Sequence, residues 1–355
     1  MNILIVKTSA IGDVTHTMPA LSCLRKHFPE AHITWLVEEA ASDLITDHRA
    51  VNRVLVSKRQ KWVKEFRSGA WLSAIKKVRV FVKQLRERDY DLVIDFQGLL
   101  KSGIWVWLSK GKKRVGFGKG MQHSECSYLF LNKKVPAVDM EIHALDREML
   151  LLEAIGVPCT KIKYDFPITP LHQQKVAHLL DCAGFQQNKQ QLIAINPQTT
   201  WETKLWYNDR FAEVADRLAA EGLFVVFTGG AADKKVVLSI QERMSHKSLD
   251  LTGKSSLKEL AALYKRADLV ISTDTGPMHI AAAVGTPLVA LFGPTAPWRT
   301  GPHGEGHQVL RHELPCSPCF KRQCPQDNEK KKCMEAITVS QVVDAALERL
   351  SVIID

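Results

Sequence analysis

Short runs of consecutive apolar residues alternate along this chain with longer segments in which apolar residues recur every three or four positions. The first kind is typical of strands buried on both faces, and the second is typical of helices that cover a sheet. In the first part of the chain the pattern predicts strands at residues 2–6, 33–37, 52–56, 92–95 and 114–117. It predicts helices at residues 14–27, 72–88 and 143–155, with another opening near residue 97. This alternation indicates a parallel sheet with helices on both faces.

The same pattern restarts after a mixed, polar segment at residues 159–170, which we interpret as an interdomain connection. Further strands are expected at residues 192–195, 224–228, 269–272 and 288–291, and helices at 208–221, from 233, at 257–266, 277–284 and 340–350. One core rarely serves 355 residues. The sequence therefore predicts two Rossmann-like domains, residues 1–160 and 161–355, and the last helix can pack on either, including back on the N-terminal one.

Composition narrows the class of protein. With 45% hydrophobic and 24% charged residues, the chain is an ordinary globular one. No apolar run reaches the roughly 18 to 20 residues that a membrane-spanning helix needs. The apolar run at the N-terminus is short and follows no basic region, so it predicts a buried strand rather than a signal peptide. We therefore expect a cytoplasmic protein.

The net charge of +10 favours an anionic partner. One group of basic residues is interleaved with aromatic residues, which suits an interfacial or membrane contact better than a simply solvated face. It comprises Lys58, Arg59, Lys61, Lys64 and Arg67, with Trp62, Phe66 and Trp71. No nucleic-acid-binding motif accompanies this charge, so a nucleic-acid partner is not expected.

The eight cysteines form two groups. Four of them follow the spacing C-x2-C-x4-C-x8-C, which in a cytosolic chain indicates a metal site or reduced thiols before disulfides. These are Cys316, Cys319, Cys324 and Cys333. The spacing suggests Zn²⁺ but is not that of a standard finger, so both alternatives stay open. The other four are expected to be scattered packing residues. These are Cys23, Cys126, Cys159 and Cys182.

Three loops each follow a predicted strand at its carboxyl end, where open α/β sheets bind ligands. They are residues 9–13, 197–206 and 273–279. In the third, Asp274 can accept hydrogen bonds from sugar hydroxyls, and the helix that starts near Gly276 offers N–H groups suited to phosphate. The alternative is an ordinary strand–turn–helix with a capping Asp or Thr.

The other two loops carry further candidate residues. Thr199, Thr200 and Lys204 supply two hydroxyl donors and one positive charge, which suit a diphosphate. Alternatively, Lys204 is a solvated surface residue and Trp206 belongs to the core. For Asp13, the alternative to a catalytic role is an N-cap before Val14.

Several of these motifs together resemble one family. The run from Ile5 to Val14, the Asp95-Phe96-Gln97-Gly98-Leu99 stretch, the Thr-Thr…Lys-Leu-Trp loop and Asp274-Thr-Gly-Pro-Met-His279 are similar to motifs of the lipopolysaccharide heptosyltransferases of glycosyltransferase family 9. The resemblance extends over nearly the whole chain in the same order. The cysteine-rich segment also resembles a subset of that family.

The resemblance implies an α/β GT-B fold, in which two Rossmann-like domains have parallel sheets facing a central cleft. It implies that the C-terminal domain binds ADP-heptose and that the N-terminal domain binds the inner core of lipopolysaccharide, with Kdo or the first heptose on lipid A as the acceptor. It further implies an inverting transfer that needs neither metal nor cofactor, at the cytoplasmic surface of the inner membrane.

The family's functional residues match positions of this chain. Asp13 matches the general base, and Lys204 matches the lysine that neutralises the diphosphate as ADP leaves. Further matching donor-binding residues are Thr199, Thr200, Asp233, Asp274, Thr275, Gly276 and His279. The matching acceptor-binding residues are Lys58, Arg59, Lys61 and Lys64.

Two other functions stay open at this stage. A GT-B enzyme could use another nucleotide sugar, such as UDP-GlcNAc, because the turn residues alone do not identify the base or the sugar. A regulatory module without catalysis could bind a nucleotide or a metal, with the cysteines as its sensor. A dehydrogenase is disfavoured, because no G-x-G-x-x-G follows the first strand.

Overall fold

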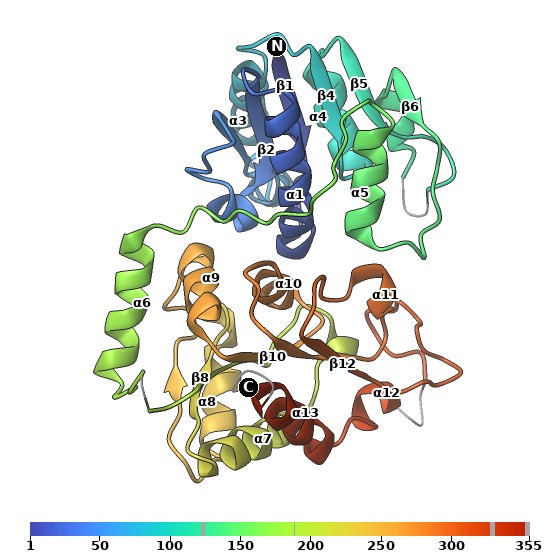
Figure 1. Cartoon of the computed structure of the whole chain (residues 1–355). Coiled ribbons are helices and arrows are strands. Elements are labelled where there is room, and N and C mark those ends of the chain that lie inside the picture. Colours follow the sequence, from blue (N-terminus) through green and yellow to red (C-terminus); the bar gives the residue numbers. More distant parts are fainter. Residues whose placement is uncertain (122–124, 188, 327–330, 352–355) are drawn as a thin grey trace. The chain divides into compact units, whose positions relative to one another are not determined.

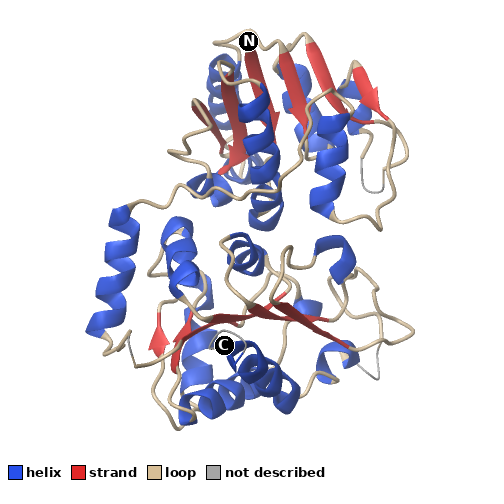
Figure 2. Ribbon diagram, in the orientation of Figure 1, coloured by secondary structure: helices blue, strands red, loops and turns tan. Residues whose placement is uncertain are grey.

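The computed structural model describes residues 1–121, 125–187, 189–326 and 331–351. The chain forms two compact units, Met1–Pro167 and Ile168–Asp355. Each unit is built on a six-stranded sheet in which neighbouring strands are parallel, and helices cover both faces of each sheet (Figure 1, Figure 2). The predicted architecture of two Rossmann-like α/β domains is therefore confirmed.

The sheet of the first unit has the order β3-β2-β1-β4-β5-β6. Its strands are β1 (Asn2–Val6), β2 (His32–Glu38), β3 (Arg53–Ser57), β4 (Leu92–Asp95), β5 (Lys113–Phe117) and β6 (Lys133–Val135). One face packs against α2 (Arg59–Arg67), α3 (Trp71–Leu85) and α4 (Leu100–Leu108). The helices α1 (Ile11–His27) and α5 (Ala144–Glu153) contact each other on the opposite face (Figure 1). Two short 3-10 helices are η1 (Glu39–Leu44) and η2 (Ser127–Phe130).

The second unit repeats this arrangement, with the order β12-β11-β10-β7-β8-β9. Its strands are β7 (Leu192–Asn196), β8 (Phe224–Phe227), β9 (Leu249–Asp250), β10 (Leu269–Thr273), β11 (Leu288–Phe292) and β12 (His307–Arg311). One face packs against α7 (Asn208–Ala220), α8 (Lys234–Gln241) and α13 (Val339–Ser351). On the other face lie α9 (Leu257–Arg266) and α10 (Gly276–Ala283) (Figure 2). The remaining helices are α6 (Pro170–Cys182), α11 (Pro297–Thr300), α12 (Lys332–Glu335), η3 (Glu202–Lys204) and η4 (Ala231–Asp233).

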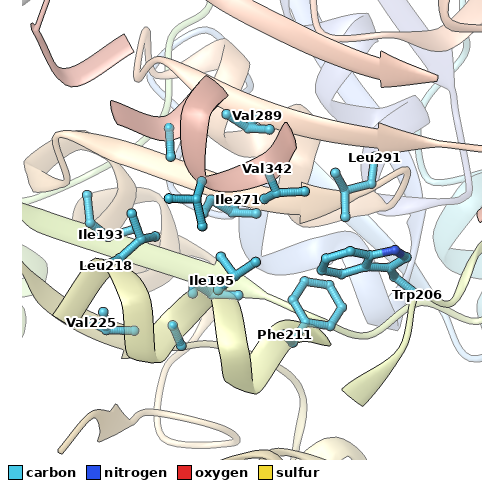
Figure 3. Packing of buried hydrophobic residues seen from close by; sticks show 14 of the residues in the cluster. Ile193, Ile195, Trp206, Phe211, Leu218, Val225, Ile271, Val289, Leu291 and Val342 are labelled. Atoms are coloured by element: carbon cyan, nitrogen blue, oxygen red, sulfur yellow. The ribbon is translucent and has the colours of Figure 1, made fainter. Parts of the chain in front are cut away.

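Alternate side chains of the central strands build the core of the second unit (Figure 3). Ile193 and Ile195 of β7 point to the same face of the sheet, where they meet Phe211 of α7 and Val342 of α13. Trp206 is also buried here, and its indole N–H donates to the carbonyl of Ile337 at 3.2 Å. The alternative interpretation of Trp206 as a core residue is therefore confirmed. The same cluster includes Val342 of α13, so this last helix packs on the sheet of the second unit.

Several elements were not predicted from the sequence. Among the helices, α2 buries one residue, Trp62, and α6 buries two, Val176 and Leu180. Such helices carry only a weak apolar stripe, which is the signal that the sequence pattern depends on. Among the strands, β6, β9 and β12 were missed, and all three lie at or next to sheet edges, where burial is incomplete.

The predicted role of the scattered cysteines is wrong. Cys23 and Cys159 form a disulfide with a Cα–Cα distance of 5.4 Å, which ties α1 to the segment that follows α5. Cys126 and Cys182 are exposed thiols. The pairing could not be read from the sequence, because 136 positions separate the two bonded cysteines.

Candidate active site

Each sheet has one point at which the strand order reverses. In the first unit this switch lies between β1 and β4, and in the second it lies between β7 and β10. Doubly wound sheets bind ligands outside the carboxyl ends of the strands at this point. The three loops predicted from the sequence follow β1, β7 and β10, so each lies at a switch point.

The loop after β1 is tied to the loop after β4. The side-chain Oε1 of Gln97 accepts the backbone N–H groups of Thr8 at 3.0 Å and Ser9 at 2.9 Å. The helix α1 begins at Ile11, with Ala10 as its N-cap, so the interpretation of Asp13 as an N-cap is wrong. Asp13 lies in the first turn, and its Oδ2 accepts the N–H of Ala10 at 2.8 Å. The Asp13 carboxylate is therefore held where the loop joins α1, and it is partly exposed.

A buried ion pair supports this loop. Lys7 Nζ lies 2.7 Å from Glu148 Oε1 and donates to the carbonyl of Phe96 at 3.0 Å. The hydroxyl of Thr17 donates to the same carboxylate oxygen at 2.9 Å. Burial alone would lower the pKa of Lys7, but the carboxylates of Glu148 and Asp13 outweigh it and raise this pKa. A positive charge is thus fixed within electrostatic reach of Asp13.

Asp95 ends β4 and shapes the second loop of the switch. Its Oδ1 accepts the N–H groups of Gln97 and Gly98, both at 3.0 Å, and its Oδ2 accepts the hydroxyl of Ser102 at 3.0 Å. Gly98 has a φ of 66°, a conformation that favours glycine. Burial raises the pKa of Asp95 to about 6, although these hydrogen bonds and Lys7 oppose the shift.

A cavity of about 320 Å³ opens between these loops and α5. Its polar lining includes Lys7, Asp13, Gln97, Arg147 and Glu148. A volume of this size lies at the lower end of the range for ligand sites. Of these five residues, only Asp13 was predicted from the sequence to have a functional role. Gln97 could have been predicted from its position just after β4. Glu148 could not, because 141 positions separate it from its partner Lys7.

The basic residues expected to bind the acceptor lie on or next to α2, but they do not form one site. Lys58 and Lys61 line a hollow of about 710 Å³ between α2 and α3. Arg59 instead lines a separate groove toward α4, and its Nε donates to Glu38 Oε1 at 2.8 Å. Lys64 is exposed on α2.

The aromatic residues interleaved with this basic cluster also differ from one another. Trp62 is not an interfacial residue, because it is buried against the rings of Phe81 and Trp105. Phe66 and Trp71, by contrast, are 59% and 50% exposed. Among the aromatic residues of this basic cluster, only Phe66 and Trp71 are exposed enough for an interfacial contact.

In the second unit the loops after β7 and β10 meet. Lys204 Nζ lies 2.6 Å from Asp274 Oδ2, which also accepts the hydroxyl of Thr295 at 2.6 Å. Lys204 stands over the ring of Trp201, with Nζ 4.5 Å from the centroid, and only 14% of its side chain is exposed. The alternative interpretation of Lys204 as a solvated surface residue is therefore wrong.

The other donor-site candidates lie around this pair. Thr275 is the N-cap of α10, Gly276 is its first residue, and His279 is buried one turn further on. In the loop after β7, Thr199 is partly exposed and Thr200 is exposed. The start of α10 thus places helix N–H groups and positive partial charge next to Asp274.

Asp233 lies after β8, the strand beside β7. Its Oδ2 accepts the N–H of Gly230 at 2.8 Å, so the carboxylate closes the turn at the start of α8. The side chain is partly exposed. Asp233 is thus on the same edge of the sheet as the Lys204 loop.

The four cysteines of the C-terminal motif converge. They line a cavity of about 20 Å³. Burial, together with the other three thiols, raises the pKa of Cys333. Over the described ranges of the chain, His, Cys, Asp and Glu side chains form no group of three or more arranged to hold a metal ion.

Comparisons with known proteins agree with this geometry. A family model described as glycosyltransferase family 9 (heptosyltransferase) matches residues 78–330. Lipopolysaccharide heptosyltransferase 1 of Pseudomonas aeruginosa is 32% identical over 345 residues, which cover 93% of this chain and 90% of that protein. The Escherichia coli K12 protein of the same name is 31% identical over 316 residues, covering 88% of this chain and 93% of its own length.

Solved structures show the same fold. A glycosyl transferase family 9 structure from Veillonella parvula has a TM-score of 0.83 and 26% identity, with 98% of this chain and 97% of that chain covered. The E. coli heptosyltransferase WaaC, solved with ADP, has a TM-score of 0.76 and 26% identity, with 98% and 100% covered.

Proposed function

The chain belongs to glycosyltransferase family 9, and we propose that it moves heptose from ADP-heptose to the inner core of lipopolysaccharide. It is a glycosyltransferase with a GT-B fold. The observation that supports the donor class is the Lys204–Asp274 pair at the start of α10. A largely covered cation beside helix N–H groups suits the diphosphate of a nucleotide sugar.

The reaction is a single displacement. An acceptor hydroxyl oxygen attacks the anomeric carbon of the heptose, and the bond from that carbon to the β-phosphate oxygen breaks. The electron pair of this bond leaves with ADP, and Asp13 takes the hydroxyl proton as the general base. One displacement inverts the anomeric centre, and no covalent intermediate on the protein is needed.

The donor-binding residues stabilise the leaving diphosphate. Lys204 neutralises its growing charge, and Asp274 positions the Lys204 ammonium group beside the start of α10. The hydroxyls of Thr199 and Thr200 bind phosphate oxygens, and Thr275 and Gly276 supply the helix terminus. Asp233 binds the ribose, and His279 supports the turn from within α10.

The acceptor sugars enter the cavity beside Asp13, and the acceptor is Kdo or the first heptose of the inner core carried on lipid A. Arg59, Lys58, Lys61 and Lys64 draw the anionic acceptor toward this unit. Transfer needs neither a metal nor a cofactor.

The protein works at the cytoplasmic surface of the inner membrane. In the described part of the chain, no helix is both long enough and apolar enough to cross a bilayer. Peripheral contact is supported by exposed apolar side chains among the cations of the first unit, such as Phe66, Trp71 and Trp107.

Transfer from ADP-heptose to a panel of truncated lipid A acceptors, with EDTA present, tests the proposal. Wild type should give product, and Asp13→Asn should give almost none. Tight ADP binding without product on any acceptor would indicate another sugar, and stronger thermal stabilisation by UDP than by ADP would identify the alternative donor. Absence of ADP binding would contradict the donor assignment itself.

A further inference from the structure

An apolar groove of the first unit lies between α2, α3 and the start of α4 and has a volume of about 720 Å³. The buried rings of Trp62 and Trp105 line it, and the exposed side chains of Phe66, Ile75 and Ile104 form its sides. These three side chains are 59%, 37% and 40% exposed. A contiguous exposed apolar surface on a soluble unit marks a binding site more often than a scattered Leu or Ile does.

Charge is distributed unevenly around this groove. Three cations line it, Arg59, Arg79 and Lys101, against one carboxylate, Glu125. Two of the cations gather at Glu38, because Arg59 donates to its Oε1 at 2.8 Å and Lys101 Nζ lies 3.6 Å from the same oxygen. This side of the groove therefore keeps a positive charge beyond what Glu38 neutralises.

The same side adjoins the proposed catalytic loop. Lys101 Nζ donates to the hydroxyl of Ser9, which lies four residues before Asp13. Leu99 lines both the apolar groove and the cavity beside Asp13. The two hollows are therefore neighbours, and a molecule with an apolar tail and an anionic polar head matches the chemistry of both.

We propose that this groove binds an acyl chain of the lipid-linked acceptor, while the anionic sugars of the same molecule reach Asp13. The proposal rests on the proposed function and extends it to the lipid part of the substrate. A protein helix would match the apolar walls but would not account for the neighbouring polar cavity, which shares Leu99 with the groove. Burying methylene groups contributes affinity in proportion to the apolar area removed from water.

A double substitution in the groove tests this assignment. Ile75→Gln with Ile104→Gln changes two exposed side chains, so the fold should tolerate both. The control is Leu171→Gln with Leu238→Gln, which alters two apolar residues of the second unit that are 71% and 52% exposed. Neither residue lines the groove or the cavity beside Asp13.

The first readout is kcat/KM with ADP-heptose on two detergent-solubilised acceptors that carry identical sugars, one acylated and one deacylated. The groove variant should lose about tenfold in kcat/KM on the acylated acceptor, through KM, and nothing on the deacylated one. The control should match wild type on both. Equal losses on both acceptors, or no loss on either, would overturn the proposal.

The second readout does not depend on catalysis. Calorimetry should show that monomeric dodecyl phosphate binds wild type and the control but binds the groove variant at least about tenfold more weakly. Equal binding to all three would overturn the assignment. If the groove variant loses binding to acceptor-free anionic vesicles while its kinetics on the solubilised acylated acceptor stay unchanged, the occupant is bulk membrane lipid and the proposal is wrong.

The two proposals can fail separately. If wild type transfers heptose to neither acceptor, the proposed function fails. The dodecyl phosphate measurement then still decides whether the groove binds an anionic amphiphile.

Discussion

At the residue scale, two carboxylates at the same switch point differ in how the protein holds them. Asp13 is partly exposed and accepts one backbone N–H, from Ala10. Asp95 is fully buried and accepts two backbone N–H groups and a hydroxyl. The first arrangement leaves an oxygen accessible to a substrate proton, and the second fixes a loop. This difference supports the proposed catalytic role of Asp13 and a positioning role for Asp95.

Asp13→Asn should lower kcat by about 10²- to 10⁴-fold, the usual contribution of a general base. The Asn side chain still offers an oxygen to the N–H of Ala10, so the loop should keep its conformation. ADP affinity, measured by calorimetry, should stay within about twofold of wild type. A variant with nearly wild-type turnover would show that Asp13 is not the base.

Lys204→Ala should weaken ADP binding by about 10- to 100-fold, because it removes a charge-assisted contact to the diphosphate. It also leaves the buried carboxylate of Asp274 without its cation. Calorimetric titration with ADP measures the effect, and Lys247→Ala on the exposed surface is the control. Unchanged ADP affinity in Lys204→Ala would contradict the donor assignment.

Asp95 should make the free energy of unfolding depend on pH. Its pKa is raised from an ordinary 3.8 to about 6, so the folded state binds the proton more tightly than the unfolded state does. Stability from this group is complete below pH 4 and is lost as the pH rises through 6, by about 3 kcal/mol in total.

Asp95→Asn should remove this loss, and urea unfolding between pH 4 and 7 measures it. Asp91→Asn is the control, because hydrogen bonds from Lys112 and from the N–H of Asn2 lower the pKa of Asp91. The contribution of Asp91 to stability therefore changes only below about pH 4, and this variant should keep the wild-type pH dependence between pH 4 and 7. If wild type and Asp95→Asn show parallel pH profiles, the buried carboxylate does not titrate as stated.

At the scale of elements, the loop after β7 is anchored at both ends. It leaves β7 at Asn196, and Trp206 enters the core two residues after Lys204. The indole packs edge-on against the ring of Phe211, with 5.0 Å between the ring centroids. Its N–H donates to the carbonyl of Ile337, in the segment that leads into α13. The position of Lys204 therefore depends on the packing of α7 and α13.

Trp206→Ala should lower the free energy of unfolding by about 3 to 5 kcal/mol, as large core truncations do. Trp206→Phe keeps an aromatic ring against Phe211 and should cost less. Chemical denaturation measures both variants. If Trp206→Ala lowers the free energy of unfolding by less than about 1 kcal/mol, Trp206 does not anchor the loop, because a substitution this mild is typical of surface positions.

At the scale of the whole molecule, charge is divided unequally. The first unit holds 27 Lys and Arg against 18 Asp and Glu, which is +9, so only +1 of the total +10 belongs to the second unit. The unit with the proposed acceptor cavity thus carries nearly all the net charge. This asymmetry directs it toward anionic surfaces.

Wild type should therefore bind anionic lipid vesicles and bind neutral vesicles far more weakly. Co-sedimentation at rising salt should show a steep loss, because the Debye length falls from about 10 Å at 0.1 M to about 3 Å at 1 M. Equal binding to neutral and anionic vesicles would contradict an electrostatic contribution.

The sequence by itself determined the fold class and the positions of the ligand loops. Strands such as β1, β4 and β10 are almost entirely buried and are built around short apolar runs, so their predicted boundaries agree with the structure to within one residue. The residues after such strands must lie at the carboxyl edge of a parallel sheet. The predicted loop that carries Asp13 and the loop that carries Asp274 therefore followed from local pattern alone.

The tertiary structure alone decided which residues meet. Lys7 and Glu148 are far apart in sequence, as are Cys23 and Cys159, and contacts of this kind leave no periodic signal. The same holds for the pairing of Lys204 with Asp274 and for the separation of Arg59 from Lys58 and Lys61. Periodicity reports which face of an element is buried, whereas packing selects the neighbour on that face.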